Sequence, residues 1–222
     1  MKKYIVFIGF YLFSLVSWAG SYEDFFKAVH NDDVRIVSSL LGRGFDPNTV
    51  NLSSEPALFF ALKSDALKTF ELLVKHPKTN LNVRNAHGET ALMLVCLKGN
   101  LQLAKLLIGR QADINHPGWT PLHYAATGGH INLIQVLLDE SAYIDAESPN
   151  GTTPLMMAAR YGSLKAVQLL LDEGADVQLK NQLGLSALDF AKQANRMDVY
   201  NELMDAQAKA NEQKPAPKAP KT

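Results

Sequence analysis

The sequence contains one cysteine, Cys96, so no disulfide can form within a single chain. It also lacks a surplus of either charge, with 22 basic and 22 acidic residues, which argues against a broadly basic surface of the kind that binds nucleic acid. The short motifs G-x-S-x-G and H-E-x-x-H and a phosphate-cradling glycine loop are missing as well. These absences predict a chain that is held together by core burial alone, has no catalytic site and does not bind nucleic acid.

A long hydrophobic run is found only within the first nineteen residues. A positive start, Met1-Lys2-Lys3, precedes an apolar stretch over residues 4–18, and Ser17 and Ala19 place small residues where a signal peptidase cleaves. The stretch is shorter than the roughly 20 residues that cross a bilayer. We therefore predict a signal peptide over residues 1–19, in preference to a retained anchor, and no membrane insertion after its removal. The predicted location is the bacterial periplasm, with secretion from the cell as the alternative.

The rest of the chain repeats itself with a period close to 33 residues. Segments beginning at Thr120 and Thr153 read TPLHYAA and TPLMMAA, and each is followed by a glycine and an apolar triplet. The alanine-like position of this motif recurs at Ala28, Ala61, Val95, Ala125, Ala158 and Ala191. A T-P-L-H-x-A motif with this period resembles the ankyrin repeat, and the resemblance covers about residues 22–204.

The resemblance implies an all-α fold, a solenoid of about six helix-turn-helix repeats joined by short β-hairpin-like fingers over residues 20–205. The atypical first and last copies are then caps, because a terminal repeat faces water on one side. The residue types suit these roles. Thr120 can accept a hydrogen bond from the free amides at a helix start, where Pro121 loses nothing. Gly129 and Gly162 are expected to end first helices in a left-handed conformation.

Two repeats depart from this pattern after their second helix. Gln111 and Ser141 stand where other copies have Gly44 and Gly174. We expect both sites either to be strained, at a cost of about 1 kcal/mol each for a non-glycine residue in the left-handed region, or to turn differently.

One interval is also short, because the alanine-like positions Val95 and Ala125 are only 30 residues apart. The junction there is reduced to little more than His116 and Pro117, which predicts a shortened finger and a notch in the row of finger tips beside Trp119. Functional use of the notch and chance loss of loop residues both remain open.

Residues 206–222 contain alanine, lysine and proline but no aromatic or branched apolar side chain. They are predicted to form a disordered tail. The tail is basic whereas the repeats are mildly acidic. This division again argues against nucleic acid as the main partner.

The histidines and the cysteine do not form a recognisable metal site. No two histidines stand four residues apart on a helix, and none has a cysteine nearby, so neither a metal nor a cofactor is predicted. His123 follows Thr-Pro-Leu and His130 follows the turn glycine, and the resemblance implies that both make structural hydrogen bonds. Cys96 occupies the second alanine position of a first helix, which predicts a buried, unreactive thiol.

The resemblance further implies that partners are bound by the finger tips and by the concave side of the first helices. Carried onto this sequence, the predicted protein-binding residues are Asn85, His87, Glu89, Lys98, Trp119, Thr127, Asn150, Arg160, Tyr161, Gln182 and Gln193. We expect Trp119, Arg160 and Tyr161 to be the anchors, because Trp, Tyr and Arg dominate binding energy at interfaces. Packing of Trp119 onto the shortened finger is the alternative explanation for that residue.

The expected function is that of a monomeric, non-catalytic protein-binding module, acting as an accessory or stabilising factor for an exported enzyme. Three other functions remain open at this point. They are an immunity or inhibitor protein that blocks a toxic enzyme, a secreted effector that binds a host protein, and a hydrolase with a site in the groove.

Overall fold

The structure, a computed structural model, describes residues 20–212. The predicted signal peptide and residues 213–222 lie outside the described residues. Two compact units, residues 20–91 and 92–212, make up the described chain. Both units are helical, and the strand-like pairings found between residues 20 and 212 are isolated bridges from Val50 to Pro56 and from Lys180 to Ser186.

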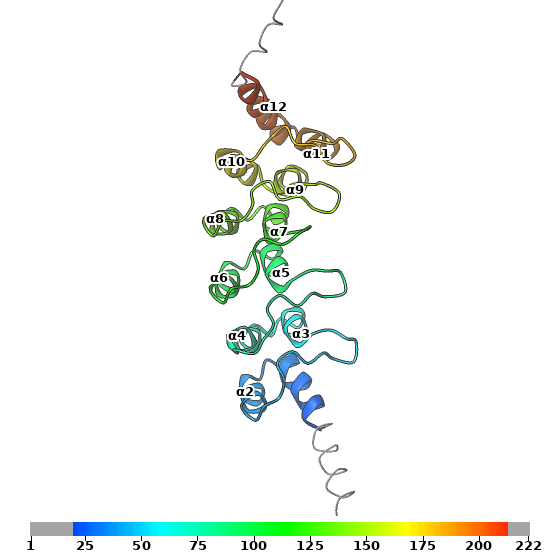
Figure 1. Cartoon of the computed structure of the whole chain (residues 1–222), viewed down its shortest axis with the longest axis vertical. Coiled ribbons are helices and arrows are strands. Elements are labelled where there is room, and N and C mark those ends of the chain that lie inside the picture. The colour runs from blue at the N-terminus through cyan, green and yellow to red at the C-terminus, as the bar shows by residue number, and fades with distance from the viewer. Residues whose placement is uncertain (1–19, 213–222) are drawn as a thin grey trace, which may run out of the picture. The chain divides into compact units, whose positions relative to one another are not determined.

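The first unit consists of helical residues 20–30 followed by α2 (Val34–Gly42), α3 (Ala57–Lys63) and α4 (Leu67–Lys75). Helix α4 packs against both α2 and α3 (Figure 1). Phe25 and Phe70 are fully buried in this unit. The carboxylate of Asp32, in the turn before α2, accepts a hydrogen bond from Thr69 N at 2.7 Å. The start of α4 is therefore held by the preceding repeat.

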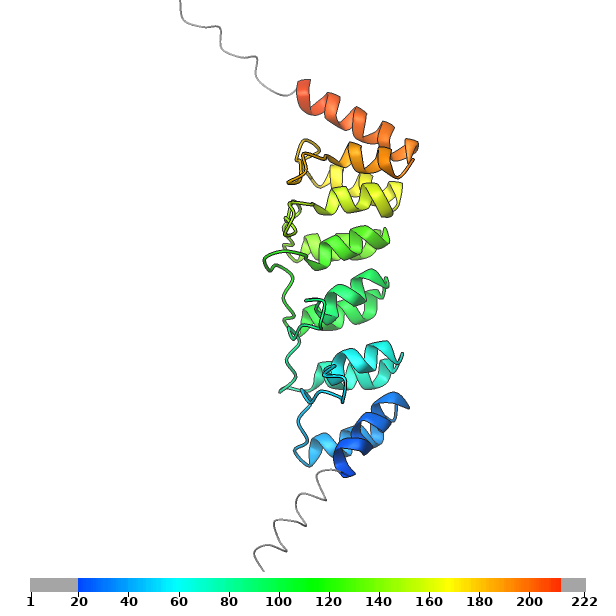
Figure 2. The same ribbon diagram turned by 90° about the vertical axis from the view of Figure 1, so that its right-hand side faces the viewer.

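The second unit continues the same helix pairs. Its helices are α5 (Ala91–Leu97), α6 (Leu101–Gly109), α7 (Pro121–Gly128), α8 (Ile131–Asp139), α9 (Pro154–Tyr161), α10 (Leu164–Asp172), α11 (Ala187–Gln193) and α12 (Met197–Glu212). The first helices α7, α9 and α11 stack on one another, and so do the second helices α6, α8, α10 and α12 (Figures 1 and 2). Stacking thus follows chain order, which confirms the predicted all-α fold of repeated helix pairs.

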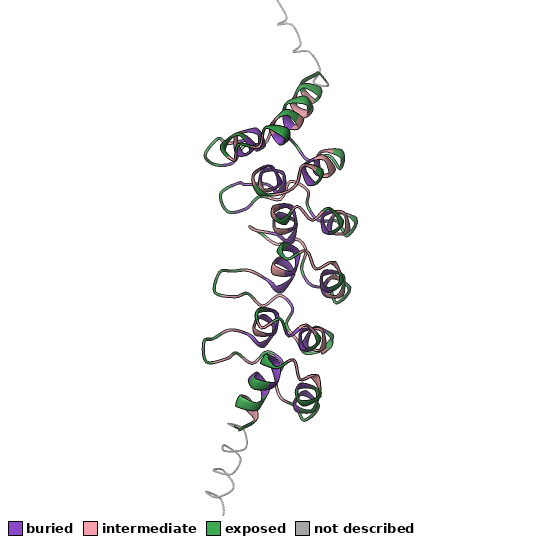
Figure 3. Ribbon diagram, turned by 180° about the vertical axis from the view of Figure 1, so that it is seen from behind, coloured by how far each residue is buried: buried purple, intermediate pink, exposed green. Residues whose placement is uncertain are grey.

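The alanine-like positions that define the period lie on the inner side of the first helices. Ala28 is 3% exposed, and Ala61, Val95, Ala125, Ala158 and Ala191 are not exposed at all. Figure 3 shows the buried residues on the helix faces that meet one another within each unit, and exposed residues on the outer sides. Small side chains at these positions let neighbouring helices approach closely and fill the core without voids.

Left-handed turns follow the same period as the helices. After the first helices the positive-φ residues are Asp32, Asp65, Gly99, Gly129 and Asn195; after the second helices they are Gly44, Gln111, Ser141 and Gly174; in the fingers they are Ser54, Gly88, Gly118, Gly151 and Gly184. Gln111 and Ser141 adopt the left-handed conformation, with φ angles of 64° and 65°, so the first of the two alternatives expected there is the one found.

The two glycines that follow α7 and α9 serve different purposes. Gly129 has φ 67° and ψ 26°, the predicted left-handed conformation. Gly162 has φ −74° and ψ −164°, so the left-handed conformation predicted for it is wrong. A Cβ at residue 162 would collide with the carbonyl oxygen of Ala126 in the preceding repeat. Glycine is therefore required at residue 162 by the close approach of two repeats, and not by its own backbone angles.

Within residues 20–212, four connections between repeats form closed fingers. In the second unit, backbone hydrogen bonds close the fingers from Ser148 N to Thr152 O at 3.0 Å and from Asn181 N to Leu185 O at 2.9 Å. The side-chain oxygen of the first finger residue also accepts a bond from the backbone N–H of the last, at 3.0 Å in both fingers. The same backbone pairing in the first unit joins Asn51 to Glu55 and Asn85 to Glu89.

The connection before α7 is the shortened one, as predicted. Figure 1 shows it as a small pointed loop, whereas the connections before α9 and α11 are wide. Asn115 in this loop donates from Nδ2 to Ser141 O at 2.8 Å, and its Oδ1 accepts from Tyr143 N at 2.9 Å. In the first unit, Asn48 makes the equivalent two bonds, to Lys78 O at 2.8 Å and from Asn80 N at 2.7 Å. An asparagine thus clamps the backbone of the following repeat.

Asp145 replaces the clamp asparagine in the repeat after Asn115. Both of its carboxylate oxygens lie near Asp176 N, at 3.1 and 3.3 Å. A carboxylate has no N–H to donate to the carbonyl of Gly174, which corresponds to the carbonyl that Asn115 binds. Burial also raises the pKa of Asp145, because the ionised form loses solvation. Asp145 therefore binds the backbone N–H of Asp176 but cannot bind a backbone carbonyl as Asn115 does.

The last helix extends past the predicted end of the repeats at residue 205. Helix α12 continues to Glu212, so the prediction of a disordered tail from residue 206 is wrong for residues 206–212. The alanines in this segment have high helix propensity, and α12 packs against α10 and α11. Gln178 Nε2 also donates to Asn211 Oδ1 at 3.2 Å, which ties the end of the helix to the preceding loop.

Replacing Asp145 by asparagine should complete the clamp. We expect Asp145→Asn to raise the free energy of unfolding at pH 7 by about 1 kcal/mol, because an N–H donor is gained and a poorly solvated charge is removed. Urea titration followed by circular dichroism measures this. Asp139→Asn is the matched control, since Asp139 is exposed and accepts only from Gln135 in its own helix. A destabilised or unchanged Asp145→Asn variant would show that the clamp does not need the donor.

Candidate functional site

Three of the predicted contact residues converge at the ends of α9 and α11. Arg160 Nε donates to Tyr161 Oη at 2.8 Å, and Arg160 Nη1 donates to Gln193 Oε1 at 3.1 Å. The guanidinium carbon also lies 5.3 Å from the ring centroid of Tyr161 and 5.9 Å from that of Phe190. Tyr161 is 58% exposed. Two neighbouring repeats therefore hold one arginine in place beside an exposed aromatic ring.

The predicted tip residues Asn150 and Gln182 are exposed and join neighbouring fingers. Gln182 N donates to Asn150 O at 3.0 Å, and Gln182 Nε2 donates to Pro149 O at 3.0 Å. Leu183 at the same tip is 77% exposed and was missed in the sequence analysis. An apolar residue inside the polar turn N-Q-L-G was a usable signal, because such a turn has no core position for it.

In the first unit, Asn85 and Glu89 shape a finger from within. Asn85 Nδ2 donates to Glu89 Oε2 at 2.7 Å, and Asn85 Oδ1 accepts from Glu89 N at 3.0 Å. His87 lies at the tip of this finger and is exposed. Leu52, in the other finger of the unit, is 96% exposed and was not predicted. His87 and Leu52 are thus the largest of the exposed side chains at the tips of this unit.

Lys98 and Thr127 occupy corresponding stretches at the ends of first helices. Lys98 is exposed directly after α5. Thr127 is half-buried, and its hydroxyl donates to His123 O at 2.7 Å within its own helix. The hydroxyl proton of Thr127 is therefore already used, which leaves its oxygen as an acceptor.

Trp119 lies beside the short connection and is half-buried. Its ring is edge-on to the imidazole of His123, with ring centroids 5.1 Å apart and an interplanar angle of 73°. The packing offered as the alternative explanation for Trp119 is therefore present. His116, in the same connection, has a buried Nε2 without a hydrogen-bond partner among the described residues. Partner binding by Trp119 stays a prediction.

His123 joins its own helix start to the next repeat. Nδ1 accepts from Thr120 N at 3.1 Å, so the proton is on Nε2, which lies 2.9 Å from Thr152 O and donates to it. Burial lowers the pKa of His123 to about 4. His130 Nε2 lies 3.0 Å from Leu97 O, a further link between repeats. The structural hydrogen bonding predicted for both histidines is confirmed.

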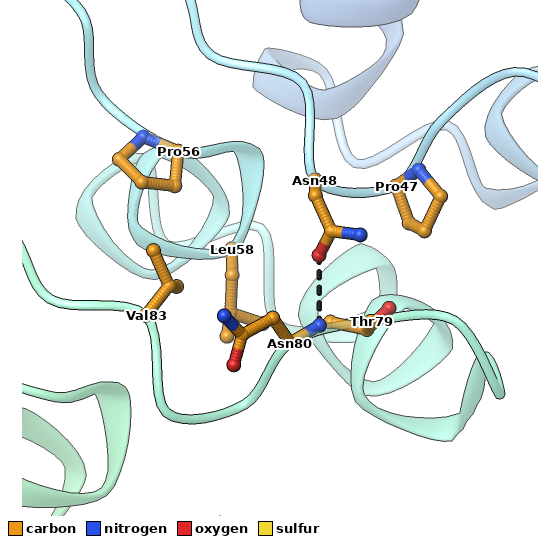
Figure 4. Close-up of a pocket in the computed structure, with 7 residues that line it drawn as sticks. All are labelled: Pro47, Asn48, Pro56, Leu58, Thr79, Asn80 and Val83. Carbon is orange, nitrogen blue, oxygen red and sulfur yellow. Dashed lines mark hydrogen bonds between the residues drawn. The ribbon is translucent and has the colours of Figure 1, made fainter.

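A pocket of about 250 Å³ lies in the first unit, away from the predicted binding residues. It is lined by Pro47, Asn48, Pro56, Leu58, Thr79, Asn80 and Val83. Figure 4 shows these residues on two successive loops and the helix start between them, with the bond from Asn80 N to Asn48 Oδ1 joining the loops. The prolines, Leu58 and Val83 give it an apolar lining with room for one large side chain. Residues so far apart in sequence carried no motif that could have revealed it.

Cys96 is fully buried, and burial raises the pKa of its thiol to about 12. This confirms the predicted core position and leaves the thiol protonated at neutral pH. Across residues 20–212, no group of three or more His, Cys, Asp or Glu side chains is placed to hold a metal ion. None of the helices in that range has the length and hydrophobicity of a membrane span.

A family model of ankyrin repeats, written for three copies, matches this chain over residues 25–117, 77–148, 92–181 and 144–214. The matches overlap along the chain and together include both units. They also reach past residue 204, where the motif is no longer visible by eye.

Several curated proteins are similar to part of the chain. The ankyrin repeat and SAM domain-containing protein 6 of Rattus norvegicus is 37% identical over 109 residues, which are 47% of this chain and 12% of that protein. The transient receptor potential cation channel subfamily A member 1 of Homo sapiens is 33% identical over 114 residues, which are 50% of this chain and 10% of that protein. The Notch-regulated ankyrin repeat-containing protein A of Danio rerio is 42% identical over 67 residues, which are 29% of this chain and 60% of that protein. The chain thus spans a small part of the first two relatives.

The depressed pKa of His123 predicts a pH-dependent stability. Because the folded-state pKa of about 4 lies below the ordinary 6.5, the unfolded chain takes up a proton first as the pH falls. Stability is therefore lost between about pH 6.5 and pH 4, by up to roughly 3 kcal/mol. Urea titrations at pH 7, 5.5 and 4.5 measure this loss.

The variant His123→Gln should remove most of that loss, because glutamine can keep both hydrogen bonds without titrating. His130→Gln is the matched control and should keep the wild-type dependence on pH. Equal pH dependence in the wild type and His123→Gln would assign the effect to other groups.

Proposed function

Since the chain belongs to the ankyrin-repeat family, we propose that it is a non-catalytic module that binds another protein. Ankyrin repeats generally act as protein-interaction modules, and the names of the relatives describe no enzyme. In this proposal the partner contacts the finger tips and the exposed ends of the first helices. No catalytic step is needed, because recognition by a preformed surface is sufficient.

The convergence of Arg160, Tyr161 and Gln193 carries this proposal. These residues come from two repeats, and their hydrogen bonds are made without a partner. Ordering a flexible side chain on binding costs about 0.5–1.5 kcal/mol. Side chains that are already ordered avoid this cost, which suits a surface built for docking.

We further propose that the protein acts in the bacterial periplasm as an accessory or stabilising factor for an exported enzyme. The signal-like residues 1–19 support export, and a chain with one buried cysteine does not depend on disulfide formation after export. A stabilising factor needs affinity for a folded surface but no activity of its own, which matches a module of this kind.

Binding is tested by pull-down from a periplasmic extract with the full chain carrying a C-terminal tag. We expect a specific partner with the wild type and a loss of about tenfold or more in affinity with Tyr161→Ala, because a good aromatic anchor contributes roughly 2 kcal/mol. Trp119→Ala tests the second predicted anchor. Tyr143→Ala is the matched control, since Tyr143 is equally an exposed tyrosine in the second unit.

Retention of every specific partner by both Tyr161→Ala and Trp119→Ala would show that the binding site lies elsewhere. Hydrolysis of ester, peptide or glycoside substrates that is abolished by changing one groove residue would contradict a non-catalytic function.

Export is tested by expressing the tagged chain in a Gram-negative host and fractionating the cells. The expected product is a chain that begins at Gly20 and is recovered by osmotic shock, with N-terminal sequencing as the measurement. A variant with Lys2→Glu and Lys3→Glu lacks the positive start and should be exported less well. An uncleaved chain in the cytoplasmic fraction would contradict the proposed location.

A further inference from the structure

We propose that the exposed end of α9 and α11 recognises an acidic segment of the partner protein, through two arginines that have no carboxylate partner of their own. The residues concerned are Arg160, Tyr161, Gln193 and Arg196, called here the two-arginine patch. This inference rests on the proposed binding function and gives the chemistry of what is bound.

Arg160 is fixed by neutral groups only. Its Nε and Nη1 donate to the hydroxyl of Tyr161 and the amide oxygen of Gln193, and aromatic rings flank the guanidinium. A guanidinium has five N–H donors, so most of its donors remain after these two bonds. Neutral acceptors orient the group but leave its positive charge uncompensated.

Arg196 lies against the same end of α9. Its Nη1 donates to the carbonyl oxygens of Ala158 and Ala159, at 3.0 and 3.1 Å. Ala159 directly precedes Arg160, so both arginines belong to or bind the last turn of α9. Arg196 is half-buried and also has neutral partners only. The patch therefore presents two guanidinium groups from successive repeats.

Neither arginine pairs with a carboxylate among residues 20–212. Ion pairs of the described chain such as Lys63 with Glu55 and Lys75 with Glu71 involve neither arginine. The repeats as a whole carry more acidic than basic residues. Two arginines without a carboxylate partner therefore stand out against a net negative charge. Arginine binds carboxylates through two parallel hydrogen bonds, which makes an acidic side chain the complementary ligand.

Compensation of the helix dipole explains part of this arrangement, since cations are stabilising at helix C-termini. It accounts for Arg196, which binds the carbonyl oxygens of Ala158 and Ala159 in the last turn of α9. It does not account for Arg160, whose described hydrogen bonds go to side chains instead of backbone carbonyls. Tyr161, which is 58% exposed, adds apolar surface beside the charge. A protein segment that carries Asp or Glu next to an apolar residue fits both features.

The test uses the full chain and a defined peptide, so it does not require the natural partner. The probe is a twelve-residue peptide of alternating glutamate and alanine with blocked ends, and the comparison peptide has glutamine in place of glutamate. Titration is followed by NMR at the side-chain N–H of the arginines. We expect a saturable shift of Arg160 Nε–H with the glutamate peptide, with a dissociation constant on the order of 1 mM, and no saturable shift with the glutamine peptide.

The variants Arg160→Gln and Arg196→Gln should each raise the dissociation constant of the glutamate peptide by about tenfold. Arg160→Lys keeps the charge but loses the planar fork, and should fall between the wild type and Arg160→Gln. Arg43→Gln, an exposed arginine of the first unit, is the control and should bind as the wild type does. Thermal melting of each variant confirms that it is folded.

Several outcomes would overturn the inference. They are no binding at 5 mM peptide, equal binding of the two peptides, and unchanged binding by both glutamine variants. Tighter, Arg160-dependent binding to phosphatidylglycerol vesicles than to the peptide would replace the acidic protein segment with a lipid surface. A pull-down that depends on Tyr161 alongside a failed peptide titration would leave the proposed function standing and remove only the acidic preference. A successful titration with no captured protein would contradict the proposed function and leave only the affinity of the patch for carboxylates.

Discussion

No helix pair in this protein can bury its own apolar side, and the rest of the structure follows from that constraint. A pair of helices seven to nine residues long, such as α3 with α4 or α9 with α10, has no interior of its own. Its leucines and alanines leave water only when a neighbouring pair covers them. The inner residues must then be small, which explains the buried positions from Ala28 to Ala191, and helices must approach so closely that Gly162 cannot carry a Cβ.

Polar groups obey the same dependence on neighbours. Short helices leave many free backbone N–H and C=O groups, and side chains of the adjacent repeat bind a number of them. Asp32 binds Thr69 N, His123 binds Thr152 O, Ser163 binds Gly129 O and Arg196 binds the end of α9. A repeat is thus completed by its neighbour in hydrogen bonding as well as in apolar burial. Asp145 shows the limit of this scheme, because a carboxylate completes only one side of the clamp.

The candidate binding surface arises from this mutual completion. Arg160 is oriented by its neighbour Tyr161 and by Gln193 from the next repeat, and the Asn150 finger is joined to the Gln182 finger by backbone and side-chain bonds. Side chains that hold repeats together are therefore also those that shape the exposed surface. This coupling favours a rigid recognition surface over one that forms on contact.

The period, the buried small positions, the unusual turns at Gln111 and Ser141 and the shortened connection before α7 could all be read from the amino-acid sequence. These features are local, because each depends on residue size, backbone angle or loop length within one repeat. Which side chains meet between repeats became evident only from the packing of the helices. The packing also shows why residue 162 is glycine, that α12 runs to Glu212, that Leu183 and Leu52 are exposed, and that Arg196 binds the carbonyls just before Arg160. Contacts between repeats join residues about 33 positions apart. Their geometry depends on how two helices pack, and no single repeat encodes that packing.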